Sequence, residues 1–161
     1  MSRKTLINLA KDNIKHAESD RVSLAKGVMK VPAANYTDKD MWELEKAKIF
    51  RRLPLLLAMS CELPEKETYL STDAVGVPII ITRDKEMKVH ALLNSCGHRG
   101  AQILSPGSGK AKRLTCPFHA WSYGLDGSLS NVFAKDLFGE IDKSERGLIR
   151  LPIHEHAGLI W

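Results

Sequence analysis

The sequence predicts a mainly β, antiparallel fold preceded by N-terminal α-helices. Apolar residues recur at helical spacing in the first third of the chain, and short apolar runs separated by turn residues follow. Two of these runs lead into loops that each contain one cysteine and one histidine. The 161 residues, 43% of them hydrophobic, suffice for one domain with a core and an appendage. We therefore expect residues 1–53 to form a helical arm and residues 54–161 to form the β domain.

Two helices are expected in the arm. Residues 5–18 place leucines and alanines at near-helical spacing with polar residues between them. A second helix is expected to be capped by Thr37 and to end before Pro54, which cannot continue it. Residues 19–35, which contain a glycine and a proline, are expected to form an extended linker.

The β domain is expected to contain many short strands. Asp126-Gly127 is a strong signal for a tight turn between two of them, and a helical turn is expected near Phe138. The expected strands are residues 55–61, 69–72, 77–82, 87–93, 102–104, 112–115, 121–123, 128–130, 148–153 and 157–161.

Charge and cysteine content exclude several classes of partner. The net charge of +5 lies in the N-terminal arm, and no basic stripe interleaved with aromatic residues predicts a nucleic-acid partner. The longest apolar run, residues 53–59, is far shorter than the roughly 20 residues of a membrane span, so no membrane partner is expected. Three cysteines give no disulfide framework, and Cys61 in an apolar run is expected to be buried. We expect a soluble cytoplasmic protein.

Four residues in two loops form the candidate metal site. Cys96 and His98 lie in the first loop, Cys116 and His119 in the second, and seventeen residues separate His98 from Cys116. Thiolates and imidazoles are ligands of soft and borderline metals, so a structural zinc site is one interpretation. Zinc knuckles usually place like ligands in one loop, whereas each loop here pairs unlike ligands. That mixture favours a cluster with two chemically different ends.

These loops resemble the Rieske iron–sulfur motif, C-x-H-x(15–17)-C-x2-H. The resemblance implies a Rieske-type fold with a [2Fe–2S] cluster, in which Cys96 and Cys116 hold one iron and His98 and His119 hold the other. More broadly the chain resembles the N-terminal part of the large subunit of Rieske non-haem iron oxygenases, the ring-hydroxylating dioxygenases. The matching pieces are residues 36–37, 43–46, 49–50, 62–64, 77–83, 93–94, 96–100, 116–123, 126–127 and 158–161.

Two features indicate the low-potential branch of this family. Respiratory Rieske proteins carry two additional loop cysteines and a serine two residues after the last histidine, where this chain has Trp121. Without those groups we expect a reduction potential near about −150 mV, although Tyr123 could donate one hydrogen bond. The chain departs from the family pattern at Gly97, expected to loosen the first loop, and at Ala120, which replaces a glycine.

The chemistry of such oxygenases occurs at a mononuclear iron whose D-x2-H-x4-H motif this sequence lacks. We assign no catalytic residue, and the chain alone is not expected to be catalytic. His154 and His156 remain; a polar strand face is the favoured interpretation and a second metal site the alternative. Because the chain stops at Trp161 within an apolar run, we expect a fragment of a longer oxygenase subunit whose catalytic domain is absent.

The resemblance therefore implies an electron-transfer domain of an aromatic ring-hydroxylating oxygenase. It would receive electrons from a ferredoxin or flavin reductase and pass them to a mononuclear iron in the catalytic domain of the same or a neighbouring subunit. A homotrimer is the assembly that the resemblance implies. A free-standing Rieske ferredoxin is the alternative, but such ferredoxins usually have about 100–120 residues and lack the helical arm. In that family the catalytic domain contacts the substrate, so an aromatic substrate is what the resemblance implies.

Overall fold

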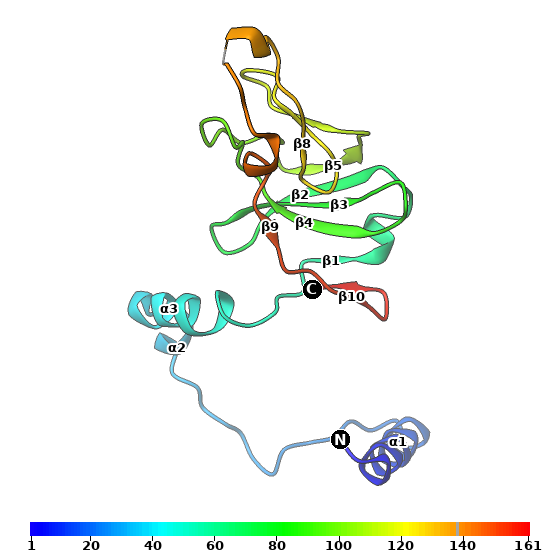
Figure 1. Cartoon of the computed structure of the whole chain (residues 1–161). Helices are drawn as coiled ribbons and strands as arrows, with labels where there is room; N and C mark the ends of the chain where they lie inside the picture. The colour runs from blue at the N-terminus through cyan, green and yellow to red at the C-terminus, as the bar shows by residue number, and fades with distance from the viewer. Residues whose placement is uncertain (138) are drawn as a thin grey trace. The chain divides into compact units, whose positions relative to one another are not determined.

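The computed structural model describes residues 1–137 and 139–161 (Figure 1). It divides into two compact units, Met1–Met41 and Trp42–Trp161, which are described separately. Phe138, near which the sequence predicted a helical turn, lies outside the described residues, and a 3-10 turn at Lys135–Leu137 precedes it. No helix in the described part of the chain is both long enough and apolar enough to cross a membrane.

The first unit contains the predicted N-terminal helix, α1 (Arg3–Glu18), and a single turn, α2 (Ala34–Thr37). The hydroxyl of Ser2 caps α1 by accepting a hydrogen bond of 3.2 Å from the backbone N–H of Thr5. Irregular backbone joins the two helices over residues 19–33, so the predicted linker ends two residues before residue 35, because α2 begins at Ala34.

A third helix, α3 (Lys39–Glu45), continues as a π-helical turn, η1 (Lys46–Phe50). Asp38, and not Thr37 as predicted from the sequence, caps this helix. The carboxylate of Asp38 accepts a hydrogen bond of 2.9 Å from the backbone N–H of Met41. Thr37 is instead the last residue of α2, and its hydroxyl donates to the carbonyl of Ala33 at 3.3 Å. Asp38 has the extended backbone that a capping residue needs, which Thr37 lacks.

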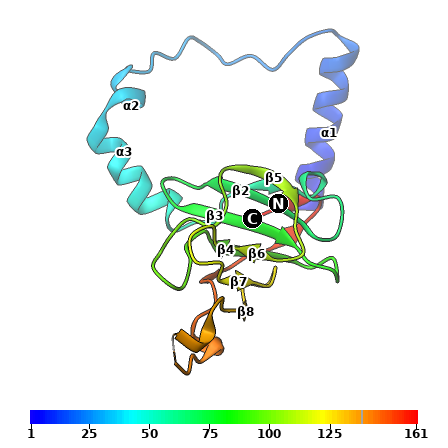
Figure 2. The same cartoon turned by 90° about the horizontal axis from the view of Figure 1, so that it is seen from above.

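The second unit consists of three antiparallel sheets with strand orders β5-β2-β3-β4-β9, β6-β7-β8 and β1-β11-β10. Figure 1 shows β8 on one side of the five-stranded sheet and the β1-β11-β10 sheet on the other, and Figure 2 gives the perpendicular view. The strands are β1 (Ala58–Met59), β2 (Thr68–Asp73), β3 (Pro78–Arg83), β4 (Val89–Leu93), β5 (Gly107–Lys110), β6 (Leu114–Thr115), β7 (Ser122–Tyr123), β8 (Leu129–Asn131), β9 (Arg150–Leu151), β10 (Glu155–His156) and β11 (Leu159–Ile160).

Strand β3 supplies side chains to two separate cores. Successive side chains of a strand point to opposite faces, so Ile80 enters one core while Ile79 and Ile81 enter the other. The first core includes both loop cysteines and Tyr123; the second includes Leu63 and Ile160. Burial on both faces explains why β3 is a continuous apolar run rather than an alternating one.

Three local predictions were wrong. Residues 102–104 form no strand, because the buried side chain of Asn94 binds the backbone of Ile103 and Leu104 instead. Strand β5 forms where the sequence indicated only a loop, pairing its glycine-rich backbone with β2. Cys61 is exposed, because a 3-10 turn at Ser60–Glu62 turns it outward and leaves Leu63 fully buried.

The buried side chain of Arg83 links three segments that surround the second core. Arg83, 5% exposed, donates from Nε to the carbonyl of Leu63 at 2.6 Å. Its two terminal nitrogens contact the carboxylate of Glu155 at 2.6 and 3.1 Å. The hydrogen bond from Arg83 holds the pKa of Glu155 below its ordinary value of 4.5. The hairpin that contains Glu155 is thereby fixed to the five-stranded sheet.

Replacing Glu155 with glutamine is expected to lower the free energy of unfolding at pH 7 by about 2 kcal/mol, because Arg83 stays buried without its counter-ion. The folded-state pKa is lowered, so this contribution is complete above pH 4.5 and is lost as the pH falls through the folded-state pKa. Urea unfolding over a pH series measures the difference. Glu65→Gln, in an exposed pair with Lys110, is the control, and an equal loss in both variants would contradict the prediction.

Candidate iron–sulfur centre

Two loops from different parts of the chain form the candidate site. The first follows β4, where the backbone N–H of Cys96 donates to the carbonyl of Ala101 and that of Gly100 donates to the carbonyl of Cys96, both at 2.8 Å. The second joins β6 to β7, where the backbone N–H of Cys116 donates to the carbonyl of Trp121 at 2.9 Å. Each loop is therefore closed by its own backbone hydrogen bonds, with a cysteine at its base.

The structure brings all four predicted residues to one cavity of about 230 Å³. Cys96 and Cys116 are each 3% exposed, whereas His98 is half-buried and His119 is exposed. The two imidazole rings meet edge to face, with centroids 4.8 Å apart. The cysteines thus form the inner end of the cavity and the histidines its outer end.

This donor set fits a binuclear cluster. Across the described residues, no three Cys, His, Asp or Glu side chains converge closely enough to hold a single metal ion. A [2Fe–2S] cluster does not need such convergence, because each iron takes only two protein ligands. Burial, and then the charges of Arg99 and His119, lowers the pKa of His98 below its ordinary 6.5. A low pKa favours the neutral imidazole, which is the form that binds metal.

Tyr123 connects the two loops. Its hydroxyl oxygen accepts a hydrogen bond of 3.0 Å from the backbone N–H of Gly97 and lies 3.1 Å from Sγ of Cys96. Because the oxygen already accepts from Gly97, its own proton is available to donate to the sulfur. Burial, reinforced by Cys96, raises the pKa of Tyr123 above its ordinary value of 10.0, so the phenol remains a donor.

Gly97 tightens the first loop, contrary to the expectation that it would loosen it. A Cβ at this position would lie 2.6 Å from the backbone carbonyl oxygen of Arg146. Only glycine permits this approach, which packs the segment around Arg146 against the loop. Ala120 does occupy a left-handed conformation, with φ of 52°, as its replacement of a glycine implied.

Sequence reasoning missed two supports of the site. The ring of Trp121 stacks on His98, with centroids 4.9 Å apart and planes 11° apart. The amide of Asn94, 1% exposed, holds the chain on the far side of the first loop by binding Ile103 and Leu104. The available signal for Asn94 was a polar residue directly after the apolar run 87–93, but neither its burial nor its partners could be read from the sequence.

The other histidines lie outside this cavity. His90 contacts Asp84 at 2.7 Å, and His16 lies on α1. His154 and His156 lie at the hairpin formed by β10 and β11, and their rings stack with centroids 5.9 Å apart. They share one face of the strand, as their spacing predicted.

Comparison with known proteins decides the family. The Rieske [2Fe-2S] domain profile matches residues 54–138, which contain both loops. This chain belongs to the Rieske [2Fe-2S] domain family. It is 38% identical over 131 residues to the carnitine monooxygenase oxygenase subunit of Acinetobacter baumannii, covering 81% of this chain and 35% of that protein. It is 34% identical over 146 residues to the glycine betaine monooxygenase oxygenase subunit of Chromohalobacter salexigens, covering 90% and 32%.

Solved structures show the same Rieske fold. Naphthalene 1,2-dioxygenase from Rhodococcus sp. superposes with a TM-score of 0.75 at 30% identity, covering 93% of this chain and 33% of that one. The quaternary ammonium Rieske monooxygenase CntA gives 0.72 at 36% identity, covering 81% and 37%. The Rieske chain described here therefore spans about a third of the length of these relatives.

Gly97→Ala is expected to destabilise the first loop by about 1–3 kcal/mol, because its Cβ would overlap the carbonyl of Arg146. The iron content of the purified protein should fall, and so should the melting temperature of the iron-loaded protein. Gly27→Ala is the matched control, since a Cβ there meets nothing within 4 Å. Wild-type iron content and melting temperature in Gly97→Ala would show that the close approach is unimportant.

Tyr123→Phe is expected to lower the reduction potential of the loaded domain, because a hydrogen bond to a ligand sulfur favours the more negative reduced state. A bond worth about 1–1.5 kcal/mol corresponds to roughly 40–65 mV for one electron. Protein-film voltammetry measures the shift, with Tyr69→Phe, on β2, as control. An unchanged potential in Tyr123→Phe would mean that the hydroxyl does not donate to Cys96.

Proposed function

We propose that Cys96 and Cys116 hold one iron of a [2Fe–2S] cluster and that His98 and His119 hold the other. The observation that carries this assignment is the single cavity, with two buried thiols at its inner end and two imidazoles at its outer end. Unlike donors at the two ends match the requirement of a Rieske cluster. We also propose residues 54–161 as the cluster domain and residues 1–53 as its helical arm.

The domain serves, on this proposal, as an electron relay in an oxygenase. A bound cluster supplies one-electron oxidation and reduction. The protein shields the thiol end in the core and leaves the imidazole end near the surface, which makes His98 and His119 the side through which electrons leave. Trp121 holds the ring of His98 in place by stacking, and Tyr123 stabilises Cys96.

The partners follow from the relatives. Their names describe oxygenase subunits, and one structural study of a quaternary ammonium Rieske monooxygenase describes inter-subunit electron transfer. We propose a ferredoxin or flavin reductase as donor, and as acceptor a mononuclear iron held outside these 161 residues in the same or a neighbouring subunit. A homotrimer and a cytoplasmic location belong to the same proposal.

The substrate is bound, on this proposal, by residues outside this chain. The relatives that match it are named for carnitine, glycine betaine, anthranilate and naphthalene, which share no common shape or charge. An aromatic substrate, implied by the resemblance to ring-hydroxylating dioxygenases, is therefore one of two proposals. A quaternary ammonium substrate is the other, supported by the carnitine and glycine betaine monooxygenases.

The chain purified without oxygen is expected to contain about two iron atoms and two sulfides, and dithionite reduction should produce a rhombic EPR signal. Cys116→Ser should abolish both, because one iron loses half of its protein ligands. Cys61→Ser removes the exposed thiol outside the cavity and should leave both unchanged. Stoichiometric zinc without iron, or full iron content in Cys116→Ser, would overturn the assignment.

A further inference from the structure

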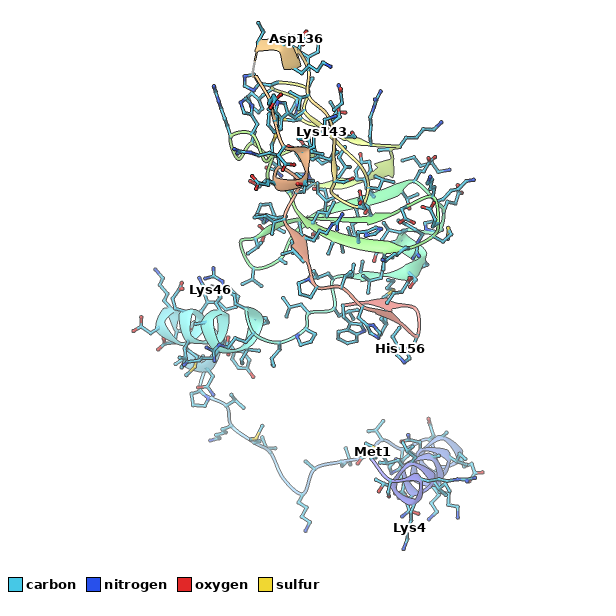
Figure 3. The ribbon with its side chains drawn as sticks, in the orientation of Figure 1. Met1, Lys4, Lys46, Asp136, Lys143 and His156 are labelled. Atoms are coloured by element: carbon cyan, nitrogen blue, oxygen red, sulfur yellow. The ribbon has the colours of Figure 1, made fainter. Side chains whose placement is uncertain are left out.

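His154 and His156 lie on a hairpin that is not part of the cluster cavity. The backbones of His154 and Trp161 exchange two hydrogen bonds, of 3.0 and 2.9 Å, and His156 lies opposite Leu159. Strand β10 is at the edge of its sheet, and Figure 3 shows His156 at the outer end of the hairpin. Both histidines are exposed.

The intervening residue fixes the direction of the two imidazoles. Side chains alternate along a strand, and Glu155 points to the buried guanidinium of Arg83, which binds both of its carboxylate oxygens. A shift of the strand by one residue would break this ion pair and bury a histidine instead. His154 and His156 are therefore held on the opposite, exposed face.

The two rings lie close enough to converge on one ion. Their planes are 17° apart and their centroids 5.9 Å apart. With metal–nitrogen distances of about 2.0–2.1 Å, two imidazoles on a tetrahedral ion place their ring centres about 5.2 Å apart. Rotation of two exposed side chains closes this difference of under 1 Å and tilts the stacked rings until both planes contain the ion. The backbone, which the hairpin and Arg83 hold in register, does not have to move.

We propose that His154 and His156 form a bidentate site for a borderline divalent cation such as Zn²⁺ or Ni²⁺, separate from the iron–sulfur centre. Imidazole is a favoured ligand of these ions. The carboxylate of Glu155 is engaged by Arg83 on the other face, so water completes the coordination. Affinity depends on both rings binding one ion, because the second contact is intramolecular once the first has formed.

Calorimetric titration of the iron-loaded, oxidised chain with NiCl₂ tests the site. We expect about one Ni²⁺ per chain, and His154→Ala or His156→Ala should weaken binding by at least roughly tenfold, since each leaves a single ligand. His16→Ala, which removes a histidine on α1, should leave the affinity unchanged. The visible absorption of the cluster reports that each variant remains folded.

A variant with the same number of histidines separates chelation from simple imidazole content. The double substitution His156→Ala with Ala157→His moves one ring into the turn, where the backbone φ of 51° is one that histidine tolerates. It should bind as weakly as His156→Ala alone. Wild-type affinity in this variant would overturn the proposal, as would loss of iron in step with Ni²⁺ uptake, which would place the ion at the cluster ligands.

Discussion

The contact between the Tyr123 hydroxyl and the first loop is the interaction on which the site depends. Tyr123 lies on β7, directly after the second loop, yet its hydroxyl oxygen contacts both Gly97 and Cys96 of the first loop. A rigid cluster requires its ligands to keep a fixed separation, and closure within each loop cannot supply it. A fully buried side chain from one loop that binds backbone and sulfur in the other does so.

The sheets stabilise that contact because both faces of β3 are buried in a core. One face of β3 packs with Tyr123 and the two loop cysteines. The other face packs against the β1-β11-β10 sheet, which the ion pair between Arg83 and Glu155 holds in place. Because protein cores are close-packed, a displacement on either face is transmitted to the other. The cavity residues therefore share strand β3 with a second core that contains the salt bridge between Arg83 and Glu155.

The sequence was most informative where chemistry depends on spacing. Two Cys/His pairs seventeen residues apart predicted four residues that the structure brings to one cavity, and the helix periodicity located α1. It was least informative about contacts in which a backbone group packs against another backbone segment or binds a side-chain amide. The approach of Gly97 to the carbonyl of Arg146 and the binding of Ile103 by Asn94 each end on a backbone group, which every residue type carries. No pattern of side chains identifies the backbone partner of such a contact, so the role of Gly97 was predicted with the wrong sign.

The separation of the cofactor from the substrate that we propose explains what this domain shares with its relatives. Proteins named for carnitine, glycine betaine and naphthalene match the chain at 30–38% identity, and the solved structures of relatives share its fold. A site that contacted the substrate would have to differ between a quaternary ammonium ion and an aromatic hydrocarbon, because one needs charge complementarity and the other an apolar pocket. A domain that only holds a cluster and presents its histidine edge faces no such demand. On the proposed function, the shared constraint is the geometry of electron delivery, to which the two loops, Tyr123 and Trp121 contribute.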